Sequence, residues 1–388
     1  MALRRIVIAP DKFKGSLSAN EAAEAIERGL RSVPGFVASV VCIPMADGGE
    51  GTVDVFLAGG ARAESALVQG PLGEPVRATF ALTEDGLAVI EMAAASGLLL
   101  LAEAQRDPLR ASTYGTGELV CRALDLGVER IVLGIGGSAT NDGGAGLLSA
   151  LGVRFLDKSG EALEAGGAAL ARLAAVDLAG LDARVRNVRL EVASDVDSVL
   201  CGPHGASTMF GAQKGASPQD ILTLDAALAH FADVTAVVTG RDRRDVAGAG
   251  AAGGLGFGLV AYLDAELRPG VEIVAEVKAL RESLGGADLC LTGEGRIDEQ
   301  TLRGKTVAGV ARCAREAGVP VIAFAGSIDV AVEPQLAQSG IACAIPIVDT
   351  PMTLERAFEN AAPLLERAAA RVGRLLALEP AATPELRH

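Results

Sequence analysis

The sequence predicts an α/β protein with two domains: a flavodoxin-like, doubly wound parallel sheet, and a mixed α/β domain inserted into it. Strand-like and helical patterns alternate at both ends of the chain, which is the order that produces a parallel sheet. A hairpin signal and mixed strand patterns interrupt this alternation in the middle. The length of 388 residues favours two domains, and an apolar half with only 3% aromatic residues suits close packing of helices on sheets.

The N-terminal segment is predicted to run strand, loop, helix, strand. An apolar run over residues 6–9 is typical of a buried strand. Ser18 and Glu21 have the spacing of a capping box, so a helix should begin at about Ser18 and end before Pro34. A second apolar run, over residues 39–44, predicts the next strand.

The C-terminal segment repeats the alternation and supplies the rest of the parallel sheet. Two strands from the front and three from the back would form one five-stranded, flavodoxin-like sheet. The predicted elements are strands over 289–292, 321–325 and 342–348, and helices over 307–317, 334–339 and 354–378.

The middle of the chain has the signals of a separate domain. Residues 76–82 and 87–91 flank a turn sequence and predict a β-hairpin, and further strands are expected over 131–134, 153–156 and 188–193. The flavodoxin-like domain is therefore expected over 1–75 and 286–380, the inserted domain over 76–285, and a disordered tail over 381–388.

Composition excludes several classes of protein. A net charge of −14 argues against a nucleic-acid partner, because phosphate backbones require a basic surface. Six scattered cysteines without a CxxC pair indicate free thiols, and a total of three histidines argues against a His-rich metal site. With no signal-like segment and no apolar run of about 20 residues, a cytoplasmic protein without a membrane partner is expected.

The loop after the first predicted strand carries Asp11, Lys12, Lys14 and Ser16. The capping box explains Ser18 and Glu21, but it does not explain two lysines, because cations oppose the helix dipole near a helix N-terminus. An anion bound at the helix start would explain them.

Two glycine-rich loops follow later predicted strands. The sequence Ala46-Asp-Gly-Gly-Glu-Gly-Thr52 offers Asp47 and Glu50 as oxygen ligands for Mg²⁺ or for substrate hydroxyls. The loop from Gly134 to Gly146 has a formal G-x-G-x-x-A pattern followed by Asp157, so a nicotinamide-dependent dehydrogenase is the rival class of enzyme. A dinucleotide fingerprint should open a helix at once, and here the loop continues, so a phosphate or metal is favoured.

The loop after the strand at 289–292 has the densest set of charges. It carries Glu294, Arg296 and Asp298, followed by Gly304-Lys305-Thr306. A Walker A motif would need glycine at the position of Glu299, so Gly-Lys-Thr does not form one here. Carboxylates, cations and amide cradles are the parts that phosphoryl transfer uses.

Nine stretches of the sequence are long and unusual in composition. They are APDKFKGSLSA, ADGGEGT, GPLGEPV, IEMAAASGL, RDPLRASTYGTGEL, GIGGSATNDGGAG, GASTMFGAQKGA, GAGAAGGLG and TGEGRIDEQTLRGKT. Together they resemble the bacterial glycerate kinase family. The resemblance implies ATP- and Mg²⁺-dependent phosphorylation of D-glycerate to 2-phosphoglycerate in an interdomain cleft. It also implies an inserted domain similar to restriction endonucleases.

Several alternatives stay open at this stage. The product could be 2- or 3-phosphoglycerate, and the general base could be Asp195 or Asp298. The anion that each lysine binds is also open, and so is whether the chain forms a homodimer. A sugar-acid binding protein is the rival outside the enzymes. The expected residues are, for catalysis, Asp195, Asp298, Lys12 and Arg296; for substrate or phosphate, Asp11, Lys14, Ser16, Gly136, Gly137, Ser138, Asn141, Lys214, Glu294 and Lys305; and for the metal, Asp47, Glu50 and Asp142.

Overall fold

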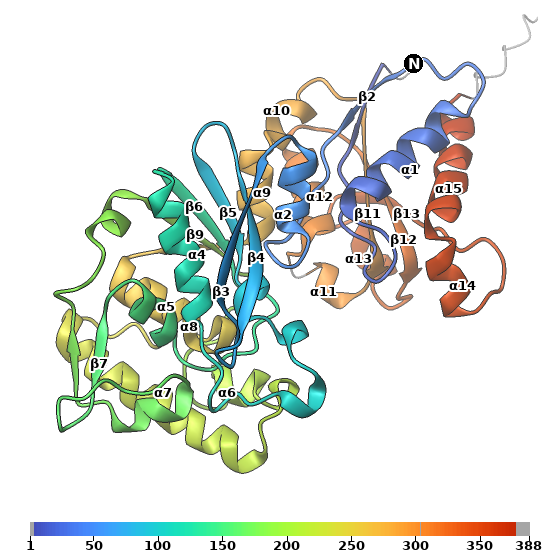
Figure 1. Cartoon of the computed structure of the whole chain (residues 1–388). Coiled ribbons are helices and arrows are strands. Elements are labelled where there is room, and N and C mark those ends of the chain that lie inside the picture. The colour runs from blue at the N-terminus through green and yellow to red at the C-terminus, as the bar shows by residue number, and fades with distance from the viewer. Residues whose placement is uncertain (1–3, 303, 378–388) are drawn as a thin grey trace, which may run out of the picture. The chain divides into compact units, whose positions relative to one another are not determined.

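The computed structural model describes residues 4–302 and 304–377 (Figure 1). The chain forms two compact units, the first containing residues up to Ala46 and from Val274 onward, and the second containing Asp47–Ile273. The second unit begins earlier in the chain than residue 76, because strand β3 (Arg62–Gln69) pairs along its length with β4 (Pro75–Leu82). The tail expected over 381–388 lies outside the described residues.

The first unit is built on the predicted five-stranded parallel sheet. Its strand order is β13-β12-β11-β1-β2, which confirms the flavodoxin-like arrangement. The chain proceeds in one direction from β1 to β2 and in the other from β11 to β13, so the order reverses between β1 and β11. Ligands of open α/β sheets bind at such a switch point, beyond the carboxyl ends of the strands. The strands are β1 (Arg5–Ile8), β2 (Ser39–Cys42), β11 (Leu289–Ile297), β12 (Val321–Ile328) and β13 (Ile341–Pro346).

Helices α1 (Ala19–Arg31) and α15 (Ala361–Leu376) pack against each other beside this sheet. The capping box is formed, with Ser18 accepting from the Glu21 amide and the Glu21 carboxylate accepting from the Ser18 amide. Gly29 allows the close approach, because a Cβ there would lie 2.3 Å from the carbonyl oxygen of Glu366. Further helices of this unit are α10 (Leu280–Leu284), α11 (Glu299–Leu302), α12 (Thr306–Glu316), and α13 (Glu333–Leu336).

The prediction of a single helix over 354–378 is wrong, because the structure has two helices there. Helix α14 (Leu354–Glu359) ends before Asn360, and α15 follows directly. Pro363 has no amide hydrogen to donate to the carbonyl of Glu359, and its ring would clash there, so the helix cannot continue through this position.

The second unit contains a six-stranded mixed sheet in the order β10-β9-β6-β5-β4-β3. The predicted hairpin is confirmed as β4 and β5, and β5, β6, β9 and β10 run parallel. The register aligns Glu91, Gly134 and Ala193 at one edge, so the loops that follow β5, β6 and β9 leave the sheet together. The parallel strands are β5 (Leu87–Glu91), β6 (Arg130–Gly134), β9 (Arg189–Ala193) and β10 (Glu266–Arg268), and β7 (Arg154–Leu156) with β8 (Ala175–Asp177) forms a separate ribbon.

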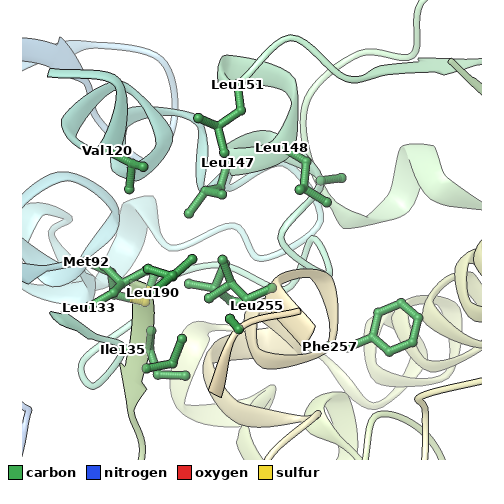
Figure 2. Packing of buried hydrophobic residues seen from close by; sticks show 14 of the residues in the cluster. Met92, Val120, Leu133, Ile135, Leu147, Leu148, Leu151, Leu190, Leu255 and Phe257 are labelled. Carbon is green, nitrogen blue, oxygen red and sulfur yellow. The ribbon is translucent and has the colours of Figure 1, made fainter. Parts of the chain in front are cut away.

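Helices bury one large apolar core in this unit (Figure 2). Leu147 and Leu148 of α5 (Ala145–Ala150) and Leu255 of α8 (Ala251–Leu263) are fully buried in it. Helices α4 (Tyr114–Asp125) and α7 (Pro218–Thr239) contribute a buried face each. By length and composition α7 could cross a membrane, which is weak evidence, and its residues Leu224–Thr235 include six that are buried inside this unit.

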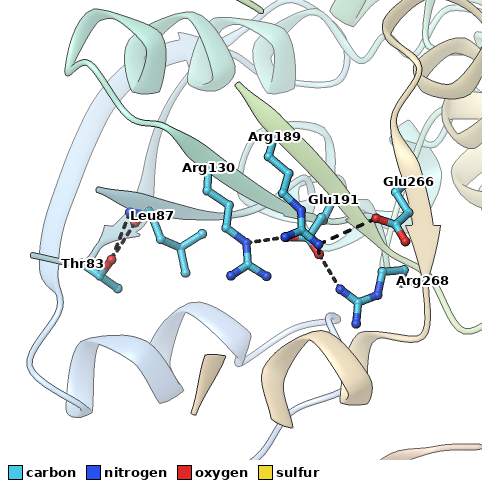
Figure 3. Close-up of polar contacts among 7 residues, drawn as sticks. All are labelled: Thr83, Leu87, Arg130, Arg189, Glu191, Glu266 and Arg268. Carbon is cyan, nitrogen blue, oxygen red and sulfur yellow. Dashed lines mark hydrogen bonds and ion pairs between the residues drawn. The ribbon is translucent and has the colours of Figure 1, made fainter. Parts of the chain in front are cut away.

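The second sheet also holds a buried ionic cluster (Figure 3). The Glu191 carboxylate on β9 is fully buried and pairs with Arg130, with Arg189 at 3.1 Å and with Arg268 at 2.5 Å. Arg189 also lies 3.9 Å from the exposed carboxylate of Glu266. A buried carboxylate needs such partners, because removing an unpaired charge from water costs roughly several kcal/mol of folding free energy.

Candidate active site

The first group of candidate residues lies where β1 ends. Asp11 is buried, and its amide donates to the Gly293 carbonyl at 2.8 Å, which holds it beside the end of β11. The Thr306 hydroxyl donates to Asp11 Oδ2, and the Lys12 amide donates to Asp11 Oδ1 at 2.7 Å. Strand pairing and the first turn of α12 therefore fix this carboxylate at the switch point of the sheet.

The two lysines of this loop differ in exposure. The Lys12 residue is half-buried, whereas Lys14 lies exposed in a turn completed by Gly15 at a φ of +81°. The Ser16 hydroxyl donates to the Phe13 carbonyl at 2.9 Å, so it contributes to this turn. Of the two, Lys12 adjoins the buried carboxylate directly and has the better position to hold an anion there.

Glu294 lies within β11, next to Asp11. The strand expected over 289–292 extends to Ile297, because its pairing with β12 continues to that residue, so the loop after it begins later than predicted. Its residue is only 9% exposed, and its Oε1 accepts a 2.7 Å hydrogen bond from the buried Thr301 hydroxyl. Burial raises the pKa of this carboxyl from 4.5 to about 7, with the nearby negative charge of Asp11 adding to the shift and the Thr301 hydrogen bond opposing it. A carboxyl group that titrates near neutrality can exchange protons with a substrate at physiological pH.

The other charges of this loop are more exposed. Arg296 Nε lies 3.4 Å from Asp298 Oδ2, and Asp298 also accepts from the Gln300 amide at 2.9 Å. Lys305 Nζ donates to the Gln300 side chain at 2.9 Å. Asp298 thus serves as a cap at the start of α11 while Arg296 and Lys305 stay accessible to an anion.

In the second unit, the glycine-rich loop after β6 begins in a tightly packed place, where a side chain would not fit. A Cβ on Gly134 would lie 2.0 Å from the Gly48 carbonyl oxygen, and one on Gly136 would lie 3.2 Å from Gly49. Gly136 and Gly137 are exposed, and Gly137 has a φ of +74°. Two accessible glycine amides next to a sheet edge are suited to receive a phosphate.

A buried lysine holds this loop in place through hydrogen bonds. Lys214 is 2% exposed, and its Nζ donates to Ser138 Oγ and to the Thr140 carbonyl, each at 2.7 Å. Burial lowers the pKa of Lys214 to about 7, and the charge of Asp142 counteracts part of that effect. Lys214 therefore positions the loop, and Ser138 keeps its own proton available for an acceptor.

Thr140 and Asn141, further along the same loop, are fully buried. Asn141 Nδ2 donates to Ser207 Oγ at 2.9 Å, while its Oδ1 has no hydrogen-bond partner among the described residues. The free group is an acceptor, which suits a hydroxyl better than a phosphate. The Thr140 hydroxyl is likewise buried without a partner in the described part of the chain.

Asp142 holds the loop together and is surrounded by protein donors. Its carboxylate accepts from the Thr113 amide at 2.8 Å and hydroxyl at 2.9 Å, and from the amides of Gly144 and Gly146. Its complete burial raises its pKa, and these hydrogen bonds counteract that effect. Such bonding suits an anchor of the loop better than a magnesium ligand.

Asp47 and Asp195 lie at the same edge of the second sheet. Asp47 Oδ1 accepts from the Gly49 amide at 3.0 Å, and Asp195 Oδ1 accepts from the Gly270 amide at 3.0 Å. A Cβ on Gly270 would lie 1.8 Å from the Asp47 carbonyl oxygen, so the two aspartate loops are in contact. Glu50 is exposed.

These residues fit a magnesium ion only together with a ligand. Among residues 4–302 and 304–377, no group of three or more Asp, Glu, His or Cys side chains could hold a metal ion by themselves. Mg²⁺ commonly uses one or two carboxylates and completes its octahedron with phosphate oxygens and water. Asp47 and Asp195 could supply carboxylates to a Mg²⁺–nucleotide complex.

The dinucleotide-binding alternative is wrong on structural grounds. The helix after the Gly134 loop, α5, begins at Ala145, and the strand that ends near Asp157, β7, pairs with β8 outside the main sheet. A dinucleotide fold needs its glycine loop to open a helix that leads to a neighbouring parallel strand.

The site residues thus form one group in each unit. Sequence reasoning missed the buried hydroxyls that hold them, because Thr and Ser in these loops have no charge or spacing that marks them. In the first unit the group contains Asp11, Lys12, Lys14, Ser16, Glu294, Arg296, Asp298 and Lys305, with Thr301 and Thr306 added; in the second it contains Asp47, Glu50, Gly136, Gly137, Ser138, Asn141, Asp142, Asp195 and Lys214, with Thr113 and Ser207 added.

A flavodoxin-like unit with carboxylates and lysines at its switch point, and a second unit with a glycine loop over a buried lysine, together define an α/β phosphotransferase that lacks a Walker A motif. The chain belongs to the glycerate kinase family, whose model matches residues 6–377, and it is a kinase.

Named relatives match over nearly their whole length. A protein of Bacillus subtilis (strain 168) named glycerate kinase is 54% identical over 368 residues, which are 94% of this chain and 96% of that protein. A protein of Escherichia coli (strain K12) named glycerate 2-kinase is 47% identical over 96% of this chain and 98% of its own length. The crystal structure of a protein assigned as glycerate kinase 2 from Salmonella typhimurium LT2 superposes with a TM-score of 0.87 at 47% identity, covering 96% of this chain and 98% of that one.

Proposed function

We propose that this kinase transfers the γ-phosphoryl group of ATP to D-glycerate and produces 2-phosphoglycerate. The observation that carries the proposal is the 47% identity, over 96% of the chain, to the Escherichia coli protein named glycerate 2-kinase. The Bacillus subtilis relative named glycerate kinase, at 54% identity, supports the same substrate. The proposed substrate is a small molecule. The net charge of −14 agrees with a small anion bound in local basic pockets rather than with nucleic acid.

The first unit is proposed to bind the acceptor. Glycerate has a carboxylate and two hydroxyls, so its site needs a cation and hydrogen-bonding carboxylates. Lys12 and Arg296 supply cations. Asp11, in the loop after β1, and Glu294, within β11, supply carboxylates. Lys14 and Lys305 add positive charge around them.

The second unit is proposed to hold the phosphates of ATP. Gly136 and Gly137 present amides at an exposed turn, and Ser138 presents a hydroxyl supported by Lys214. Mg²⁺ bound through Asp47 and Asp195 would neutralise negative charge on the phosphoryl oxygens. Asp142 and Asn141 are proposed to shape the loop, and Glu50 is proposed to bind the Mg²⁺ ion through a water molecule.

The reaction is tested by ADP release from the purified full chain. With ATP, Mg²⁺ and D-glycerate together, ADP should form at a rate typical of kinases, about 1–100 s⁻¹. Omission of D-glycerate or chelation of Mg²⁺ should abolish it. A nicotinamide dehydrogenase would instead change absorbance at the reduced-cofactor band, and a sugar-acid binding protein would bind D-glycerate without releasing ADP. A cytoplasmic location, where ATP is abundant, is part of the proposal.

A further inference from the structure

One carboxyl group at the switch point of the first sheet is nearly buried and keeps one oxygen available to a ligand. Glu294 follows the buried core of β11, and its residue is 9% exposed. Its Oε1 accepts from the Thr301 hydroxyl at 2.7 Å, which leaves Oε2 as an acceptor. The side chain therefore combines a fixed orientation with a dry environment, and it lies beside the loop that follows β1, at the switch point where ligands of this fold bind.

The charges around Glu294 are of both signs. Among the described residues, Asp11 faces it from the loop after β1, Asp298 from the start of α11, and Lys305 from the residue before α12. The pKa of Glu294 rises to about 7, chiefly through burial. The two negative neighbours raise it further, and Lys305 and the Thr301 hydrogen bond lower it.

The two aspartates expected as general bases have less suitable surroundings. Asp298 is paired with Arg296 and accepts from the Gln300 amide, so it is occupied as a helix cap. Asp195 is exposed and accepts from the Gly270 amide. Neither side chain is buried, so neither has the dry and fixed environment of Glu294.

We propose that Glu294 is the catalytic base that accepts the proton of the C2 hydroxyl of D-glycerate. The inference rests on the proposed function and names the base for that reaction. As the hydroxyl oxygen bonds to the γ-phosphorus, the bond from that phosphorus to the β,γ-bridging oxygen breaks and ADP leaves with the electron pair. The O–H bond breaks toward Glu294, whose carboxyl group later gives the proton to solvent.

The first test compares isosteric variants. Glu294→Gln cannot accept the proton and should lower kcat/KM by about 10²–10⁴-fold, with the dissociation constant of Mg²⁺–ATP within about threefold of wild type. Glu294→Asp keeps the carboxylate and should recover part of the activity. Glu299→Gln, an exposed glutamate in the same segment, is the matched control and should retain wild-type activity.

A pH profile of kcat/KM distinguishes a base from a structural residue. Activity should fall below an apparent pKa near 7, where Glu294 becomes protonated. Thr301→Val removes the hydrogen bond that stabilises the ionised form, so the acidic limb should move to higher pH by roughly 0.5–1 unit, whereas Thr301→Ser should not move it. Asp11→Asn removes a negative neighbour, so the limb should move to lower pH, whatever the level of activity that remains.

The results separate this inference from the proposed function. If wild type releases no ADP with D-glycerate, the function fails and the base assignment fails with it. If wild type is active but Glu294→Gln stays within tenfold of it, or if the acidic limb does not move in opposite directions in Thr301→Val and Asp11→Asn, the function stands and Glu294 is not the base.

Discussion

Lys214 and Ser138 lie 76 residues apart in the chain, and the ammonium group of the lysine donates a 2.7 Å hydrogen bond to the serine hydroxyl. The same nitrogen donates at 2.7 Å to the Thr140 carbonyl, so one buried side chain fixes two points of the glycine-rich loop. The backbone of that loop carries the amides proposed to hold the phosphates of ATP. We therefore expect the buried lysine to affect ATP binding only through the loop.

Removal of the Lys214 ammonium should loosen the phosphate loop. In Lys214→Met the Ser138 hydroxyl and the Thr140 carbonyl lose their donor, and the KM for ATP should rise by about tenfold or more while the KM for D-glycerate changes little. Steady-state kinetics with each substrate varied in turn measures this split. Lys158→Met, on an exposed turn of the same unit, is the control. Equal changes in both KM values would argue against a role in ATP binding.

Lys12 should contribute to anion binding in the first unit. Lys12→Ala should lower kcat/KM by about a hundredfold, near 2.7 kcal/mol, because it removes a half-buried cation from the loop whose backbone is fixed by the buried Asp11 carboxylate. The substrate whose KM rises identifies the anion it meets. Activity close to wild type in Lys12→Ala would show that the acceptor site is elsewhere.

Glu294 should make the stability of the protein depend on pH. Its pKa is raised in the folded state, from 4.5 to about 7, so its favourable contribution is present below pH 4.5 and is lost as the pH rises through 7. Glu294→Gln has no charge to bury and should therefore be more stable than wild type by about 2–3 kcal/mol at pH 8, with little difference at pH 4.5. Denaturant unfolding at both pH values measures the difference. A difference that is the same at pH 4.5 and 8 would contradict the burial of this charge.

The ionic cluster of the second unit should matter for stability alone. Glu191→Gln leaves Arg130, Arg189 and Arg268 without their shared buried carboxylate and should destabilise the protein by about 3–5 kcal/mol. Glu266→Gln, whose side chain is 60% exposed and 3.9 Å from Arg189, should cost less than about 0.5 kcal/mol. Thermal unfolding of the two variants compares them, and similar Tm values would refute a structural role for the buried pairings.

Local patterns predicted much of the fold. Ser18 and Glu21 identified the start of α1, and the alternation of strands and helices identified the five-stranded sheet, because capping and hydrophobic periodicity depend on neighbours in sequence. The division of the last helix at Asn360 could have been predicted from Pro363. The pairing of β3 with β4 shifted the domain boundary, since β3 alternates only weakly in hydrophobicity.

The arrangement of the site was less predictable. Charged residues after a strand end identified Asp11 and Lys12, since parallel strands bring their loops to one edge. Glu294 was expected in a loop as well, but it lies within β11. Partners far apart in sequence, such as Thr306 with Asp11 or Lys214 with Ser138, depend on tertiary packing and have no local signal. Burial likewise decides which carboxyl group titrates near neutrality. From sequence, the general base was expected to be Asp195 or Asp298, and Glu294 was expected to bind substrate or phosphate.

The most direct test of the account is the identity of the phosphorylated product. The purified full chain is supplied with Mg²⁺–ATP and D-glycerate, and the product is passed to enolase with no phosphoglycerate mutase present. Phosphorylation at the C2 hydroxyl predicts immediate formation of phosphoenolpyruvate, because 2-phosphoglycerate is the substrate of enolase. A product that enolase consumes only after the mutase is added would be 3-phosphoglycerate and would contradict phosphorylation at the C2 hydroxyl, and no product at all would contradict the proposed function.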